Sequence, residues 1–363
     1  MPSSLLSLGL MSGTSLDGVD AALIGTDGEH VASFGACMTR AYPQSLRERL
    51  RAILGGHGPV AEVEREMTLF HADVVAALLE ENAISRSAVS VIGFHGHTIL
   101  HRPEQGRTWQ IGDGALLAER SGIVVVNDFR TNDVAAGGQG APLVPVYHAA
   151  LVGDLARPLA ILNLGGVGNV TWIGEDGDLL AFDTGPGNAL IDDWALRHTG
   201  RPIDHNGALA RMGVVDANAL RAFREHPYFT QPPPKSLDRD DFAKIALALV
   251  AGLSAADGAA TLSAFTCAAV DKARLYFPSA PRRWLICGGG RHNPVLMDML
   301  RRCLEVPVDP VDTVGWDGDA LEAQAFAFLA VRSLKGLPLT WPGTTGVARP
   351  LIGGRVHRPG VPA

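Results

Sequence analysis

The stretch Leu5 to Ile24, LLSLGLMSGTSLDGVDAALI, decides the fold that we predict for this chain. Two apolar runs flank a turn made of small, polar and glycine residues, which is typical of a β-hairpin. The tip, residues 12–18, exposes its backbone because Gly13 and Gly18 carry no side chain and tolerate close approach. We therefore expect the tip to touch a ligand, although an ordinary turn favours the same residue types.

The donor groups of this tip suit a polyphosphate. Ser12, Thr14 and Ser15 add hydroxyl groups to the backbone N–H donors. Asp17 supplies a carboxylate that a phosphate-bound Mg²⁺ could recruit, directly or through water. The tip matches neither G-x-x-x-x-G-K-[ST] nor G-x-G-x-x-G, so two familiar nucleotide motifs are disfavoured and the rest of the chain must decide.

Composition bounds the class of protein. A length of 363 residues predicts two domains, and 47% hydrophobic with 19% charged residues is typical of a compact soluble chain. The formal net charge of −7 argues against a nucleic-acid partner, which usually requires a basic surface. The sequence has no apolar run of about 20 residues and no basic leader, so we expect a cytoplasmic protein without a membrane partner.

The second half of the chain opens as the first does. Leu159 to Trp172, LAILNLGGVGNVTW, is again apolar strand, glycine-rich turn and apolar strand. This likeness predicts two related α/β domains that face each other across a cleft, although two hairpins can also resemble each other by chance. The predicted boundaries are residues 1–150 for the first domain, 151–340 for the second and 341–363 for a C-terminal tail.

Asp183 stands where a predicted strand ends in a glycine-rich loop. The strand Leu179 to Phe182 leads into DTGPGN, and a helix follows from Asn188 to His198. The start of a helix favours negative charge, and Gly185 leaves the backbone bare beside it. The arrangement indicates a carboxylate placed for chemistry, with a turn or helix-capping residue as the alternative.

A third glycine-rich loop lies further on. Trp284 to Cys287 is a predicted strand that ends in Gly288, Gly289 and Gly290, and Asn293-Pro294 starts a helix. A strand, a glycine run and a helix in this order indicate close approach of a ligand to the backbone. We expect an adenine or a ribose there.

Eight motifs stand in one order along the chain. They are GLMSGTSLDGVD, FHGHTILHRP, QIGDGALLAE, DFRTNDVAAGGQGAPLVP, LNLGGVGNVT, FDTGPGNALID, CGGGRHNPVLM and LEAQAFAFLA. Together they resemble the anhydro-N-acetylmuramic acid kinase family, which belongs to the acetate and sugar kinase, heat-shock cognate and actin superfamily. The resemblance covers about Leu8 to Val347.

This resemblance implies a fold and a reaction. The fold is two ribonuclease-H-like, actin-like ATPase domains, with mixed sheets flanked by helices and ATP bound in a central cleft. The reaction converts 1,6-anhydro-N-acetylmuramic acid, ATP and water into N-acetylmuramic acid 6-phosphate and ADP, with Mg²⁺ as cofactor. It also implies recycling of cell-wall peptidoglycan, amino-sugar metabolism and a homodimer.

The family's site residues map onto this chain motif by motif. The nucleotide-binding set is Ser12, Gly13, Thr14, Ser15, Leu16, Asp17, Gly18 and Val19 in the first hairpin, Gly165, Gly166 and Asn169 in the second, and Gly288, Gly289 and Gly290. The catalytic aspartate maps onto Asp183. The resemblance implies that Asp183 takes a proton from the water that attacks the anomeric carbon, while the released O6 receives the phosphoryl group.

The sugar-binding residues are expected in three places. Arg130, Asn132 and Asp133 in FRTND suit sugar hydroxyls and a lactyl carboxylate, although Arg130 could equally form a surface ion pair. Gly185 lies beside the predicted catalytic residue. Glu322 is a carboxylate among apolar neighbours, and an ordinary helix-surface glutamate is the alternative.

Two further segments leave questions open. His95, His97 and His101 share one face of a strand and invite a zinc site, but Gly96 and the following turn interrupt the strand, so we predict no metal ligands among these histidines. The segment KSLDRDDF departs from the KSTGRE-type sequence of relatives, which leaves the role of Lys235 and Ser236 undecided.

Two other functions fit parts of the pattern. A kinase of another sugar or small acid would keep the fold and change the phosphoryl acceptor, since a fold does not fix a substrate. An actin-like or chaperone-like nucleotide switch would assemble with ATP and turn over no sugar.

Overall fold

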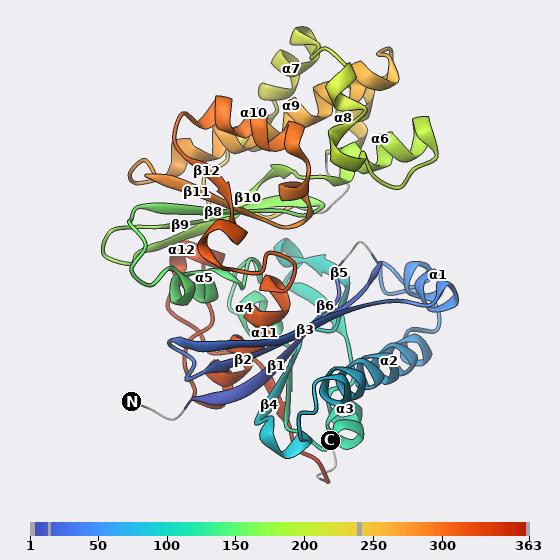
Figure 1. Ribbon diagram of the computed structural model, residues 1–363, viewed down its shortest axis with the longest axis vertical. Helices are drawn as coiled ribbons and strands as arrows, with labels where there is room; N and C mark the ends of the chain where they lie inside the picture. Colours follow the sequence, from blue (N-terminus) through green and yellow to red (C-terminus); the bar gives the residue numbers. More distant parts are fainter. Residues whose placement is uncertain (1–3, 14–15, 238–241, 361–363) are drawn as a thin grey trace. The chain divides into compact units, whose positions relative to one another are not determined.

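The computed structural model describes residues 4–13, 16–237 and 242–360 of the chain (Figure 1). It divides into two compact units. The first unit comprises residues 1–153 together with 320–363, and the second comprises residues 154–319. Each unit contains one mixed sheet with helices packed against it, and each is described by itself.

The first unit is built on a six-stranded sheet. Its order is β13-β7-β4-β1-β2-β3, with β1 and β2 forming an antiparallel hairpin in which Leu5 lies opposite Thr26. This confirms the hairpin predicted from the opening sequence. Strands β4 and β7 continue parallel to β1. The strand bounds are β1 (Leu5–Met11), β2 (Gly18–Thr26), β3 (Val31–Ala41), β4 (Val91–Phe94), β7 (Val125–Asn127) and β13 (Arg355–His357).

Helices cover this sheet on both faces. Leu8 and Leu10 of β1 belong to one buried cluster with Val63 and Met67 of α2 (Val60–Glu81). Gly9 points the other way, because side chains alternate along a strand. There α11 (Leu321–Leu334) lies so close that a Cβ on Gly9 would sit 1.8 Å from the carbonyl oxygen of Ala323. The backbone of α11 therefore requires glycine beneath it.

This contact gives a stability prediction. Gly9→Ala places its Cβ against helix backbone that cannot rotate aside, so we expect a loss of at least about 3 kcal/mol, the upper end of the usual range for overpacking. Gly252→Ala is the matched control, because nothing lies within 4 Å of its added Cβ. Urea unfolding of the two variants checks this, and an unchanged midpoint for Gly9→Ala would contradict the packing described.

The unit boundary differs from the predicted one at the C-terminal end. We expected residues 320–340 in the second domain and a separate tail after 340, whereas α11 and the last strand belong to the first unit. Helix α11 is buried against β1 and β4, and β13 pairs antiparallel with β7. Gly9, which admits α11, lies more than 300 residues before that helix in the chain, so no local pattern marks this return.

The second unit repeats the first topologically. Its sheet runs β10-β9-β8-β11-β12, with β8, β9 and β10 antiparallel in turn and β11 and β12 parallel to β8. The first unit has the same order and directions in β3-β2-β1-β4-β7. This shared arrangement confirms two ribonuclease-H-like α/β units. The bounds are β8 (Leu159–Leu164), β9 (Val167–Ile173), β10 (Leu179–Pro186), β11 (Arg283–Cys287) and β12 (Val308–Pro310).

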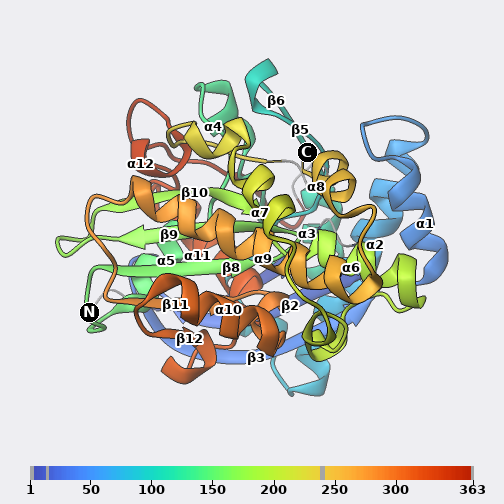
Figure 2. The same ribbon diagram turned by 90° about the horizontal axis from the view of Figure 1, so that it is seen from above.

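Helices of the second unit lie over this sheet, as Figure 2 shows for α9 (Ala255–Ala273) and α10 (Pro294–Leu304). Leu162 and Phe182 of the sheet pack with Val270 and Leu296 of these helices. Helix α9 begins after Ser254, whose side chain caps it by accepting the Asp257 amide at 3.1 Å.

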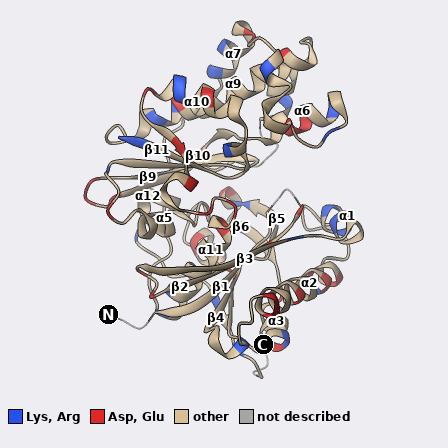
Figure 3. Cartoon of the chain, in the orientation of Figure 1, with Lys and Arg blue, Asp and Glu red and all other residues tan. Residues whose placement is uncertain are grey.

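Ten further α-helices and strands are described. They are α1 (Gln44–Ala52), α3 (Gly114–Ser121), α4 (Thr131–Ala135), α5 (Pro145–Val152), α6 (Ala189–Thr199), α7 (Ala217–Arg224), α8 (Ala243–Val250), α12 (Pro342–Thr345), β5 (His97–Arg102) and β6 (Arg107–Ile111). Basic and acidic residues are interspersed over the elements of each unit (Figure 3). Among the described helices, none is both long enough and apolar enough to cross a bilayer.

Candidate active site

A backbone hydrogen bond links the described residues of the first hairpin tip. Within it, the Leu16 amide donates to the Gly13 carbonyl at 3.1 Å, and Leu16 has a positive φ of 58°. The side chains of Leu16 and Val19 are buried in the core of the first unit. Only their backbone groups can therefore face a ligand. The predicted Thr14 and Ser15 lie outside the described residues.

The hydroxyl of Ser12 is held inside the unit rather than presented to solvent. Ser12 is only 2% exposed, accepts the Tyr42 hydroxyl at 2.8 Å and lies 3.1 Å from Nδ1 of His97. Burial lowers the pKa of His97 to about 4, so the ring is neutral. The Tyr42 amide also donates to the carbonyl of Asp17 at 3.0 Å. Tyr42, which the sequence did not reveal, thus fixes both ends of the tip.

Gly18 and Asp17, at the end of the tip, have different surroundings. A Cβ on Gly18 would lie 2.4 Å from the carbonyl oxygen of Arg40 in the neighbouring strand, so pairing of β2 with β3 requires glycine there. The side chain of Asp17 is exposed. A carboxylate oxygen at an exposed turn is a ligand that Mg²⁺ accepts.

Arg130 is tied to the histidine-bearing segment of the first unit. Its Nη1 donates to the carbonyl of Gly140 at 2.7 Å, and its Nε and Nη2 lie 3.3 and 3.1 Å from Nε2 of His95. Burial first, and the guanidinium second, hold the pKa of His95 well below its ordinary value. The neutral ring therefore accepts from Arg130 at Nε2, while its Nδ1 lies 2.9 Å from the carbonyl of Gly96. Arg130 thus connects the segment that follows β4, which carries His95, to the loop that carries Gly140.

Asn132 and Asp133 follow Arg130 at the start of α4 and make contacts within the unit. Asn132 donates to the carbonyl of Ile352 at 3.1 Å from an exposed position. Asp133 is 2% exposed and accepts the Gly140 amide at 2.6 Å on one oxygen and the Thr345 hydroxyl at 2.6 Å on the other. The carboxylate of Asp133 thus shapes the loop that carries Arg130.

The three histidines with strand-like spacing do not form a metal site in the described part of the chain. His97 faces Ser12, His95 faces Arg130, and Nδ1 of His101 lies 3.0 Å from the Thr108 hydroxyl. Among described residues, no group of three or more His, Cys, Asp or Glu side chains is placed to hold a metal ion.

Glu322 and a surface pocket of the first unit lie on different elements. Glu322 is half-buried in the first turn of α11. A pocket of about 320 Å³ opens between β6, the start of α3 and β13, and Trp109 and Thr131 are part of its wall. That wall includes none of the predicted site residues.

In the second unit, the tip of the second hairpin packs against the start of α6. The carbonyl of Gly165 accepts the Asn188 amide at 2.7 Å, and the carbonyl of Gly166 accepts the Gly187 amide at 3.0 Å. A Cβ on Gly187 would lie 2.2 Å from the Gly165 oxygen. The glycines thus allow a hairpin tip and a helix start to meet backbone to backbone.

Asp183 lies at an irregular end of β10. It stands opposite Asn169 of β9, and the pairing register shifts between Asp183 and Gly185. Such bulges re-aim side chains near active sites. Asp183 is 8% exposed, and its Oδ2 accepts the amide of Leu237 at 2.8 Å. The carboxylate is therefore held in one orientation.

The glycine run after β11 lies beside the same hairpin. Gly288 has a φ of 72°, and a Cβ on it would lie 2.2 Å from Oδ1 of Asn163 at the end of β8. Because Asn163, Asn169 and Asp183 are opposite one another on β8, β9 and β10, the structure brings these predicted segments together. They lie at the carboxyl ends of the parallel strands, where open α/β sheets usually bind ligands.

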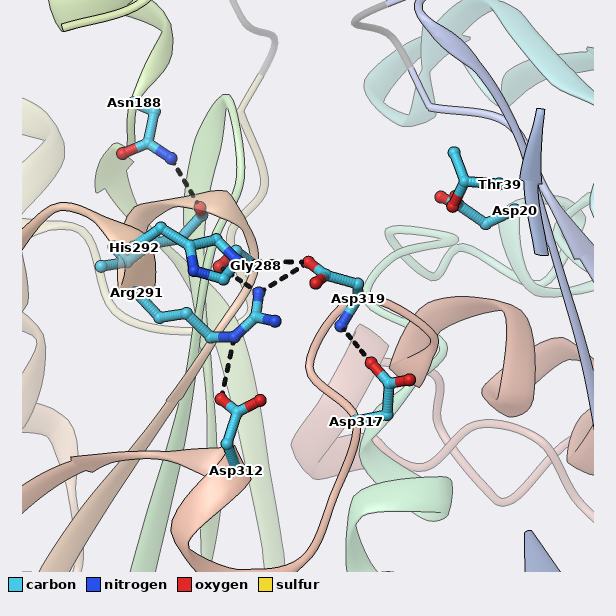
Figure 4. A network of polar contacts seen from close by, with 10 residues as sticks. Asp20, Thr39, Asn188, Gly288, Arg291, His292, Asp312, Asp317 and Asp319 are labelled. Atoms are coloured by element: carbon cyan, nitrogen blue, oxygen red, sulfur yellow. Dashed lines mark hydrogen bonds and ion pairs between the residues drawn. The ribbon is translucent and has the colours of Figure 1, made fainter. Parts of the chain in front are cut away.

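Arg291, which sequence reasoning missed, braces this glycine run. Figure 4 shows its guanidinium between two carboxylates, with Asp312 at 3.0 Å and Asp319 at 2.8 Å. It also donates to the carbonyl of Gly288 at 3.1 Å. The hydrogen bond from Arg291 lowers the pKa of Asp319 below its ordinary value, so that carboxylate is charged. The only feature of the sequence that could have indicated Arg291 is its position directly after three glycines.

Comparison with known proteins identifies the family of this chain. The family model described as anhydro-N-acetylmuramic acid kinase matches residues 5–359. A protein of that name from Paramagnetospirillum magneticum is 64% identical, covering 98% of this chain and 100% of that protein. One from Rhodospirillum rubrum is 60% identical over 96% of this chain and 93% of that protein. The chain therefore belongs to the anhydro-N-acetylmuramic acid kinase family.

Proposed function

We propose that this enzyme uses ATP and water to convert 1,6-anhydro-N-acetylmuramic acid into N-acetylmuramic acid 6-phosphate and ADP. Family membership supports the kinase activity and the sugar acceptor. The observation that carries the proposal is Asp183, a fixed carboxylate at a bulged strand end, opposite Asn169 and beside two glycine-rich loops. This is a place where phosphate groups and a reacting water can be held against backbone donors.

Phosphoryl transfer asks the protein mainly to position reactants and to neutralise charge. In our proposal the phosphates lie against backbone N–H groups of the first tip and of Gly165 and Gly166, and the adenine or ribose of ATP lies against residues 288–290. Asp17 would hold Mg²⁺, because its exposed carboxylate offers the oxygen ligand that this ion prefers. The ion, when bound, would neutralise charge on the transferring group.

The sugar step needs a base for one water molecule. The water oxygen bonds to the anomeric carbon, the bond from that carbon to O6 breaks, and one proton of the water passes to Asp183. O6 then takes the γ-phosphoryl group and ADP leaves. Asp183 suits this role because its position is fixed by a backbone hydrogen bond to Oδ2.

Recognition of the sugar is proposed for residues outside the phosphate loops. The guanidinium of Arg130 is positioned by Gly140 and His95 and suits the lactyl carboxylate. Asn132, Gly185 and Glu322 are the proposed hydroxyl and amide contacts. Asp133 contributes by shaping the Arg130 loop, since both of its oxygens accept bonds within the unit.

The metabolic role and the compartment follow from the same proposal. Its product is an amino-sugar phosphate, which fits recycling of cell-wall peptidoglycan in the cytoplasm. The central cleft and the homodimer implied by the sequence resemblance remain predictions.

An isotope experiment tests the reaction. Purified protein is incubated with ATP, Mg²⁺ and the anhydro sugar in ¹⁸O-labelled water, and the sugar phosphate is analysed by mass spectrometry. We expect one ¹⁸O atom per product, at the anomeric hydroxyl, and one ADP per sugar phosphate. ADP release without label would indicate a kinase for another acceptor. ATP-dependent assembly in sedimentation without sugar turnover would indicate a nucleotide switch.

A further inference from the structure

Lys235 is a buried cation on the segment that departs from the pattern of relatives. The residue is 7% exposed, and its Nζ lies 4.5, 4.6 and 5.5 Å from the ring centroids of Tyr228, Tyr276 and Phe182. We call these three rings the aromatic cage. The ammonium also donates to the carbonyl of Tyr228 at 3.2 Å. Its surroundings are thus ring faces and a peptide oxygen.

Lys235 is hydrogen-bonded to Asp183 through the backbone. The Asp183 amide donates to the carbonyl of Lys235 at 3.1 Å, and the Leu237 amide donates to Oδ2 of Asp183 at 2.8 Å. The hydroxyl of Tyr228, a cage member, donates to the Asp183 carbonyl at 2.5 Å. The segment 235–237 and the cage therefore contact the backbone on both sides of Asp183 and its carboxylate.

Two opposing energetic effects act on the caged ammonium. A desolvated cation is attracted to the faces of aromatic rings, which opposes the cost of burying the charge. Burial lowers the pKa of Lys235 to about 8, so the ammonium is mostly charged near neutral pH. Because the backbone of Lys235 continues into Leu237 within two residues, anchoring the ammonium also fixes the Leu237 amide.

We propose that Lys235 is a positioning residue for the catalytic carboxylate. Held in the aromatic cage, it keeps segment 235–237 against β10, so that Leu237 holds Asp183 in the orientation needed to accept a proton from water. The kinetic part of this inference rests on the proposed function. The structural part concerns only the contact between Leu237 and Asp183.

Lys235→Met tests it, because methionine keeps the length and removes the charge. We expect kcat to fall at least tenfold with KM for ATP and sugar within about threefold, since the loops that bind the substrates are elsewhere. The acid limb of the kcat profile should move to higher pH, because a carboxylate that loses an amide donor is easier to protonate. Lys244→Met, at an exposed position on α8, is the control and should leave both unchanged.

Amide hydrogen exchange at Leu237 supplies a readout that needs no substrate. Exchange should be at least tenfold faster in Lys235→Met than in the wild-type protein or in Lys244→Met. Unchanged exchange together with unchanged kcat and acid limb would overturn the inference. Faster exchange in a protein that never hydrolyses the anhydro sugar would support the positioning role and contradict the proposed reaction instead.

Discussion

Asp183→Asn will lower kcat for the anhydro sugar by about three to four orders of magnitude and leave nucleotide affinity within about twofold. General-base catalysis contributes roughly 10²- to 10⁴-fold, and this reaction needs a base to activate water. Asparagine has nearly the same shape, and its side-chain oxygen can still accept the Leu237 amide that contacts Oδ2 in the wild-type protein. Only the ability to take a proton is lost.

The measurement pairs steady-state kinetics with calorimetric titration of a non-hydrolysable ATP analogue. Asp176→Asn is the control, because Asp176 is exposed in the turn between β9 and β10 and should be neutral in both assays. Retained turnover in Asp183→Asn would remove Asp183 from its proposed role. Loss of nucleotide binding as well would mean that the substitution disturbs the glycine loops opposite it.

Both hairpins and the candidate catalytic residue Asp183 were predicted from local sequence patterns. The apolar runs that flank Ser12–Gly18 and Gly165–Gly166 are visible within 20 residues, and so is an acidic residue at the end of a strand. The return of α11 to the first unit was not predictable in the same way. Its partners Gly9 and Gly93 reveal their role only when the helix backbone is seen against them.

The supporting contacts of the site were hidden for the same physical reason. Tyr42 reaches Ser12 across 30 residues, and Leu237 reaches Asp183 across 54. Neither residue belongs to a type or spacing that signals chemistry. Sequence therefore located the groups proposed to react, while the groups that fix their orientation had to come from tertiary structure.

The first unit will lose stability steeply as pH falls from about 6.5 to 4. Burial lowers the pKa of His71, His97 and His101 to about 4, and that of His148 to about 3. Between these values and the ordinary 6.5, the unfolded chain binds more protons than the folded one, so acid favours unfolding. The contribution is present above pH 6.5 and lost below the folded pKa. For a wholly buried ring such as His71 it amounts to about 3 kcal/mol.

His71 allows the test because it lies away from the proposed reacting groups, on α2. Its Nδ1 lies 2.8 Å from the Met67 carbonyl and its ring packs 5.0 Å from that of Phe94, so leucine can replace it within an apolar core. We expect His71→Leu to lose less stability between pH 7.5 and 5 than the wild-type protein, by about 2 kcal/mol. His57→Leu, at an exposed position, should keep the wild-type slope. Urea unfolding followed by hydrogen exchange localises the change to the first unit, and equal slopes in all three proteins would show that His71 titrates normally despite its burial.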